Sequence, residues 1–201
     1  MLIDAYGDDQ IIGMSSMMSV SQQNEMVGAQ SILQQTFNDS GITIANHATG
    51  GTSSSLQNEL RGLDGNGAPY ADRIKLSKAS IVIESHTLND ALGGETIDDY
   101  RQYLVQWVVD VRAAGKVPVL EESGPVCDGD HPQLAAYVQA MDDAATQYNV
   151  ALIAQYQYLL TVPNYCSHLN AGFYPDDAIY AIKAQREAAA LTPIIKTLVG
   201  E

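Results

Sequence analysis

Basic residues are scarce in this sequence, with 10 Lys and Arg against 24 Asp and Glu and a formal net charge of −14. A negative field of this size repels phosphate backbones and anionic lipids, so we expect no nucleic-acid partner and no membrane partner. Long apolar runs are also lacking, since none approaches the roughly 18 residues that span a bilayer. The first residues lack the pattern of a signal peptide. We therefore expect a soluble protein, and favour a secreted or virion-associated location.

Cysteine is almost absent, and only Cys127 and Cys166 are present. Two cysteines without a nearby CxxC partner make a poor zinc site. In the fold predicted below, both fall in loops at the same end of a sheet. A disulfide between them is therefore expected in an oxidising compartment, and two unrelated thiols are the alternative.

Short apolar runs alternate with amphipathic segments along the whole chain. The amphipathic segment 22–37 carries Met26, Leu33 and Phe37 on one face, and Thr96 begins a second such segment. A last helix is predicted from Pro175, with a break at Pro193. This order predicts one α/β domain over residues 1–201, a three-layer, doubly wound, five-stranded parallel sheet. The five strand-like runs are Leu2–Tyr6, Ile42–Ala45, Ile81–Glu84, Val117–Leu120 and Val150–Ala154.

Four short motifs stand at the ends of these elements. Gly7-Asp8-Asp9-Gln10 follows the first run, and the motifs 46–52 and 88–90 follow the second and third. The motif 169–176, Leu-Asn-Ala-Gly-Phe-Tyr-Pro-Asp, precedes the last helix. In this order the motifs resemble the four blocks of the SGNH (GDSL-type) hydrolase superfamily over nearly the whole chain. The resemblance implies a flavodoxin-like sheet and a catalytic cleft beyond the strand ends.

The resemblance also implies that the catalytic triad is replaced. The family's nucleophilic serine falls on Asp9, and its Asp-x-x-His pair falls on Ala171 and Tyr174. Asp9 has no hydroxyl, Ala171 cannot orient a base, and Tyr174 is a poor base at neutral pH. His168 is a possible substitute base, although an exposed loop histidine is the simpler interpretation. We therefore expect no serine-esterase activity.

Two other positions match the family. Gly51 and Asn89 correspond to residues that, in relatives, hold the oxyanion with a backbone N–H and a side-chain amide. Both residue types are also common in tight turns and caps. Asp8 matches an aspartate that is mainly structural in relatives, so we expect it to brace a loop.

Carboxylates gather where the strands are predicted to end. Asp9, Glu84 and Glu122 stand at the ends of three strands, with His86 beside Glu84, and ligands bind at this edge of such sheets. Two carboxylates can hydrolyse a glycosidic bond, so Asp9 and Glu122 are the candidate acid/base pair and Glu84 a tuning neighbour. The same four side chains could hold a divalent cation, but no metal-loop spacing is present, and we expect neither a metal nor a cofactor. An acidic, solvated rim is the plainest alternative.

Aromatic residues other than tyrosine are few, with 11 Tyr against 2 Phe and 1 Trp. A tyrosine combines a flat apolar face with a hydroxyl, which suits stacking on sugars, and Tyr174 is predicted to enter the cleft. The sequence thus favours a carbohydrate-directed hydrolase, with Gly51, Asn89, His86 and Tyr174 contacting a glycan or another small polar ligand. The alternative is a catalytically inactive domain that binds a glycan or receptor, for example in a phage tail or cell-surface assembly.

Overall fold

The computed structural model describes residues 1–51 and 53–200; Thr52, the last residue of the second motif, lies outside them. The strands are β1 Leu2–Gly7, β2 Met14–Ser16, β3 Ser19–Val20, β4 Thr43–Asn46, β5 Ile81–Ser85, β6 Val117–Glu121, β7 Ala151–Ile153, β8 Leu169–Asn170 and β9 Tyr174–Pro175. The helices are α1 Asp9–Ile12, α2 Glu25–Phe37, α3 Leu56–Arg61, α4 Tyr70–Leu76, α5 Leu88–Gly93, α6 Ile97–Ala113, α7 Leu134–Tyr148, α8 Tyr156–Leu159 and α9 Asp177–Val199, with a 3₁₀ turn at Tyr165–His168.

The main sheet is five-stranded in the order β4-β1-β5-β6-β7, and every neighbouring pair is parallel. Its strands coincide with the five predicted runs to within one residue at every end. The predicted α/β class and parallel sheet are therefore confirmed. The chain starts in the central region of the sheet and winds outward in both directions, so the ends of β1, β4 and β5 lie next to one another.

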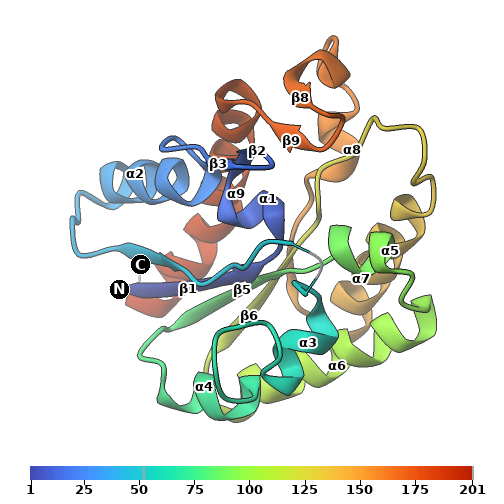
Figure 1. The fold of residues 1–201 in the computed structure, drawn as a ribbon. Coiled ribbons are helices and arrows are strands. Elements are labelled where there is room, and N and C mark those ends of the chain that lie inside the picture. The colour runs from blue at the N-terminus through green and yellow to red at the C-terminus, as the bar shows by residue number, and fades with distance from the viewer. Residues whose placement is uncertain (52, 201) are drawn as a thin grey trace.

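Helices cover both faces of the sheet, which gives the predicted three layers (Figure 1). Helices α2 and α9 pack against each other on one face, where Ile3, Ile81 and Ile83 meet Leu33 and Leu191. Helices α3, α4, α6 and α7 cover the other face. Side chains alternate between these two layers along each strand, because successive residues of a strand point to opposite faces.

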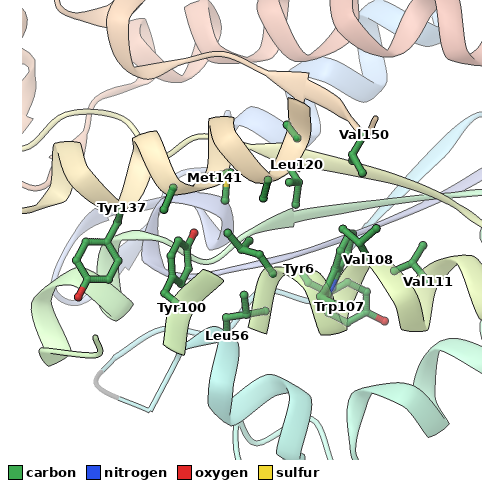
Figure 2. Close-up of a cluster of buried hydrophobic side chains, with 14 of the residues drawn as sticks. Tyr6, Leu56, Tyr100, Trp107, Val108, Val111, Leu120, Tyr137, Met141 and Val150 are labelled. Carbon is green, nitrogen blue, oxygen red and sulfur yellow. The ribbon is translucent and has the colours of Figure 1, made fainter. Parts of the chain in front are cut away.

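The layer of α3, α4, α6 and α7 holds the largest of the buried clusters (Figure 2). Tyr70 stacks on Trp107 with ring centroids 5.9 Å apart, and Tyr6 meets Tyr70 edge-on at 5.2 Å. Trp107 comes from the inward face of α6, as its helical spacing with Leu104, Val108 and Val111 predicts. Thr96 caps this helix by accepting a hydrogen bond from the backbone N–H of Asp99.

One predicted helix boundary is wrong. Helix α9 continues through Pro193 to Val199 instead of breaking there. A proline removes one backbone donor from a helix, but Leu191 and Ile195 are buried on either side of it and hold both segments against the sheet. Asp176 caps the start of α9 by accepting hydrogen bonds from the backbone N–H groups of Ala178 and Ile179.

Two small antiparallel sheets lie beyond the carboxyl ends of the main strands (Figure 1), and the sequence does not predict them. β2 pairs with β3, β8 pairs with β9, and β2 contacts β9. A disulfide joins Cys127 to Cys166 in the same region, which confirms the predicted pairing. Within the described ranges, no helix has both the length and the apolar character that crossing a membrane requires.

Candidate functional site

A cavity of about 450 Å³ opens at the carboxyl ends of β1, β4 and β5. The loops after these strands supply its base, the β2–β3 hairpin one wall, and the β8–β9 turn another. Its lining residues are Asp9, Met14, Met17, Gly50, Gly51, Leu88, Asn89, Leu92, Phe173 and Tyr174. The structure thus brings together four of the residues singled out in the sequence, namely Asp9, Gly51, Asn89 and Tyr174.

Asp9 is the centre of the hydrogen bonding in this cavity. Its Oδ1 lies 3.2 Å from the backbone nitrogen of Gly51, and its Oδ2 accepts a hydrogen bond of 3.0 Å from Asn89 Nδ2. Asn89 Nδ2 also donates to the Gly51 carbonyl at 3.1 Å. A Cβ at Gly50 would stand 2.8 Å from Asp9 Oδ1, so a larger residue there would displace the carboxylate from this position. The carboxylate therefore occupies both donors that the SGNH resemblance assigns to an oxyanion.

Asp8 braces the neighbouring loop, as the sequence predicts. Its Oδ2 accepts hydrogen bonds from the backbone nitrogens of Leu88 at 2.9 Å and Asn89 at 3.3 Å. Its Oδ1 accepts one from Gln10 and so caps α1. Burial raises the pKa of Asp8, which is fully inaccessible to solvent. This residue fixes the start of α5, and with it the position of the Asn89 side chain.

Glu84 and His86 do not line the cavity, contrary to the prediction. Successive residues of β5 point to opposite faces of the sheet: Val82 packs in the layer of α3 and α6, and Ile83 packs in the layer of α2 and α9. Glu84 therefore points into the same layer as Val82 and away from the cavity. There His86 Nδ1 lies 2.7 Å from Glu84 and 3.0 Å from Glu59. Burial raises the pKa of Glu84 to about 7. Although burial alone would lower it, the pKa of His86 is raised well above its usual range by the two carboxylates.

Glu59 was missed in the sequence, because α3 is too short to show a clear buried face. It is completely buried and faces the same histidine as Glu84. The four side chains of the alternative cation site do not come together. Glu84 and His86 cluster with Glu59, Asp9 lines the cavity, and Glu122 is bound to the backbone of Tyr156.

Glu122 also lies off the cavity lining. Its Oε2 accepts a hydrogen bond of 2.6 Å from the backbone nitrogen of Tyr156, which ties β6 to α8. Burial and a hydrogen bond shared with Asp142 raise the pKa of Glu122 to about 7. Its neighbour Glu121 points to the opposite layer, where it accepts from Gln155 at 2.9 Å. Asp9 and Glu122 therefore have no common partner and do not face one cavity.

Tyr174 closes the cavity beside Phe173, with ring centroids 6.2 Å apart. Burial and the charge of Asp9 both raise the pKa of Tyr174, which keeps its hydroxyl protonated. His168 is directed elsewhere: its Nδ1 lies 2.8 Å from Asp176 Oδ2, in a neighbouring hollow of about 580 Å³. Among the described lining residues of the cavity there is no serine, threonine, cysteine or histidine.

Solved structures with the same arrangement of elements include esterases and lipolytic proteins. A lipase/acylhydrolase from Enterococcus faecalis superposes with a TM-score of 0.79 at 14% identity, over 96% of each chain. A lipolytic protein of the G-D-S-L family from Veillonella parvula gives 0.66 at 14% identity, over 96% of this chain and 97% of its own. The chain has the SGNH-hydrolase fold. An acetylxylan esterase from Geobacillus stearothermophilus gives 0.70 at 12% identity, over 96% of this chain and 92% of its own.

These similarities concern the fold, because the identities are low. No protein-family model matches the sequence. No curated protein sequence matches it either. Within the SGNH fold, the cavity lies where the resemblance places the catalytic cleft, and its chemistry must be argued from the residues that line it.

Proposed function

We propose that the protein is a ligand-binding domain on the SGNH fold, which uses the former esterase cavity without hydrolysing esters. The observation that supports this proposal is the pair of hydrogen bonds from Gly51 N–H and Asn89 Nδ2 to Asp9. An esterase needs such donors for the oxygen that becomes negative in its tetrahedral intermediate. Here a carboxylate of the protein occupies them, so an ester carbonyl would meet negative charge instead of donors.

Nucleophilic catalysis lacks its other parts as well. The hydroxyl of Tyr174 is the one hydroxyl among the described lining residues, and its raised pKa makes it a poor nucleophile. No imidazole lies beside it in the lining. The cavity has a volume of about 450 Å³ and largely apolar walls, and these are features that small-molecule binding requires.

A carbohydrate-directed hydrolase is the second candidate, and the wealth of carboxylates in the sequence favours it. Its mechanism needs two carboxyl groups on opposite sides of one glycosidic bond, about 5–9.5 Å apart. Asp9 supplies one, but Glu84 and Glu122 are engaged outside the cavity lining. Glycan binding without cleavage is compatible with Tyr174 and Phe173 in the wall, and a tail or cell-surface assembly is a setting that suits such a domain.

The test combines activity and binding. We expect no turnover of short-chain aryl esters, no labelling by a fluorophosphonate probe, and no product from a panel of oligosaccharides. Saturable binding of a small ligand should be weakened by Leu92→Trp, which fills the cavity, and unaffected by Val109→Trp on the exposed face of α6. Ester turnover that is abolished by a single Ser→Ala substitution would refute the proposal. Glycan cleavage that is abolished by Asp9→Asn would establish the second candidate instead.

A further inference from the structure

The hydrogen-bonding polarity of the cavity is the reverse of that in an esterase. Gly51 N–H and Asn89 Nδ2, its two convergent donors, are both engaged by Asp9. What remains for a ligand is the acceptor capacity of the Asp9 oxygens, since a carboxylate offers about four lone-pair positions, and the Tyr174 hydroxyl, which both donates and accepts. A ligand group that pairs with Asp9 must therefore donate. We propose that the cavity binds a primary ammonium group on a short apolar body, with the ammonium on the Asp9 carboxylate.

This proposal rests on the ligand-binding function and specifies the ligand's chemistry. Asp9 is 8% exposed, and no Lys, Arg or His side chain of the described residues lies within 4.0 Å of its carboxylate. Two other buried carboxylates do have a cation: Lys183 lies 2.6 Å from Glu25, and Arg73 lies 3.0 Å from Asp64. A buried charge is costly unless it is paired, so a cationic ligand gains more at Asp9 than a neutral one.

The walls favour an ammonium with an apolar body. Apart from Asp9, Asn89 and the two glycines, the lining consists of methionine, leucine, phenylalanine and tyrosine side chains. Phe173 and Tyr174 can place ring faces against a cation, and the thioethers of Met14 and Met17 adapt to an irregular apolar shape. A volume of about 450 Å³ is within the range of small-molecule sites. The net charge of −14 also attracts cations to the molecule.

Other ligand classes fit less well. A carboxylate product of ester hydrolysis would be repelled by Asp9, and a neutral hydroxyl donates without neutralising its charge. A lysine side chain of a peptide carries the same group as a free alkylamine, namely a primary ammonium on an apolar stem. The structure predicts the order ammonium, then alcohol, then carboxylate for ligands of equal length.

The experiment measures binding of n-hexylammonium, n-hexanol and hexanoate to the intact protein by titration calorimetry. We expect n-hexylammonium to bind at least about 10-fold more tightly than n-hexanol, because hydrogen bonds between charged groups are stronger than those of a neutral hydroxyl. Hexanoate should not bind. Asp9→Asn, which keeps the shape of the side chain, should remove the advantage of the ammonium. Asp98→Asn makes the same change in net charge at an exposed side chain of α6 and should leave it intact.

Each outcome discriminates. Equal affinities for n-hexylammonium and n-hexanol, or equal losses in Asp9→Asn and Asp98→Asn, would overturn the ammonium site while leaving a binding cavity. If none of the three probes nor any glycan binds, the binding function itself fails. The series on the unaltered protein decides the question even if Asp9→Asn does not fold. N-acetyl-lysine methylamide, compared with its Nε-acetylated form, then distinguishes a peptide lysine from a free amine.

Discussion

Asp9 makes contacts that a serine at the same position does not make. Its side chain is one atom longer and ends in two acceptors, which reach Gly51 N–H and Asn89 Nδ2. The donors that the SGNH resemblance assigns to an oxyanion thus hold a side-chain carboxylate instead, and Asp8 braces the loop that carries Asn89. On the proposed function, the residue at position 9 decides which ligands the cavity accepts, while the framework around it is that of the SGNH fold.

Rebuilding the triad tests this account of position 9. In the triple variant Asp9→Ser, Ala171→Asp, Tyr174→His, the oxyanion donors are freed and a base faces the new hydroxyl, so we expect labelling by a fluorophosphonate. Asp9→Ser alone has a nucleophile without a base, and it should react at least ~10³-fold more slowly. Labelling of the triple variant no faster than that of the single one would contradict the assignment of these positions to the triad.

The sequence placed the carboxylates on the correct strands but in the wrong surroundings. The parallel-sheet rule correctly predicts that Asp9, Glu84 and Glu122 stand at strand ends, and the resemblance pairs Asp9 with Gly51 and Asn89. The parallel-sheet rule does not fix the direction of a side chain, because that direction alternates from residue to residue and depends on where the strand ends. Glu84 and Glu122 therefore enter layers of helices, where Glu59 and Asp142 meet them. Those partners come from distant segments that no local pattern connects.

A second network of buried charges is indicated by the spacing of residues along the sequence of α9. Lys183 and Glu187 follow Ile179 at intervals of four, so they share the inward face of α9 and are fully buried. Lys183 lies 2.6 Å from Glu25, and Gln155 donates to both Glu25 and Glu121 at 2.9 Å. Burial lowers the pKa of Lys183, but Glu25 and Glu121 more than offset this and raise it.

Removing the Lys183 ammonium should therefore strongly destabilise the folded protein. Lys183→Met leaves buried carboxylates without their cation, and we expect a loss of about 3–5 kcal/mol in unfolding free energy, measured in urea. Glu25→Leu should cost a similar amount by itself. The double variant should be more stable than the sum of the two losses implies, because no unpaired charge remains between α2 and α9. Strictly additive losses would show that the ion pair does not couple the two helices.

At the scale of elements, long helices and central strands follow from periodicity, whereas short elements do not. The two hairpins have two or three residues per strand, too few for an alternation to be read. They nevertheless form two walls of the cavity, through Met14 and Met17 on one side and Phe173 and Tyr174 on the other. The two hairpins that wall the cavity are thus the part of the site that the sequence predicts least.

The β8–β9 turn carries a specific strain. Phe173 N–H donates to the carbonyl of Asn170, and the two central residues have positive φ, 51° at Ala171 and 77° at Gly172. A left-handed conformation costs an alanine roughly 1–2 kcal/mol, while asparagine tolerates it better and Asn-Gly is favoured in such turns. Ala171→Asn should raise the unfolding free energy by about 0.5–1 kcal/mol in chemical denaturation. A decrease would mean that the Ala171 side chain makes contacts that outweigh its strain.

The disulfide fixes two loops near this turn. It joins residues 39 positions apart, and Cys127 N–H also donates to the Gly172 carbonyl. Closing a loop of about 40 residues contributes on the order of 3–4 kcal/mol in the chain-entropy model. The double substitution Cys127→Ser, Cys166→Ser should lower the unfolding free energy by about that amount, and reductant should lower the melting temperature of the unaltered protein alone. Equal melting temperatures with and without reductant would contradict a structural role.

Over the whole molecule, acidic residues lie in the interior as well as on the surface. Burial raises the pKa of Glu84, Asp90 and Glu122 to about 7 each. The pKa values of Glu121 and Glu187 are also raised well above their usual range, by burial and by Glu25. All these groups are buried, so folding holds protons on carboxyl groups that the unfolded chain releases near pH 4.

Stability should therefore fall as the pH rises. A carboxyl group whose pKa is raised by folding contributes its full stability below its unfolded pKa, near 4, and loses it progressively up to its folded pKa, here about 7. Asp4 and Asp176, whose pKa values are lowered by their histidine partners against the effect of burial, act in the opposite direction but only below about pH 4. We expect maximal stability near pH 5 and a loss of at least about 2 kcal/mol by pH 8, measured by urea unfolding at constant ionic strength. Glu84→Gln, which is neutral at both pH values, should show a smaller loss between them. A free energy of unfolding that is constant or increases from pH 5 to pH 8 would show that these buried carboxyl groups are ionised in the folded protein.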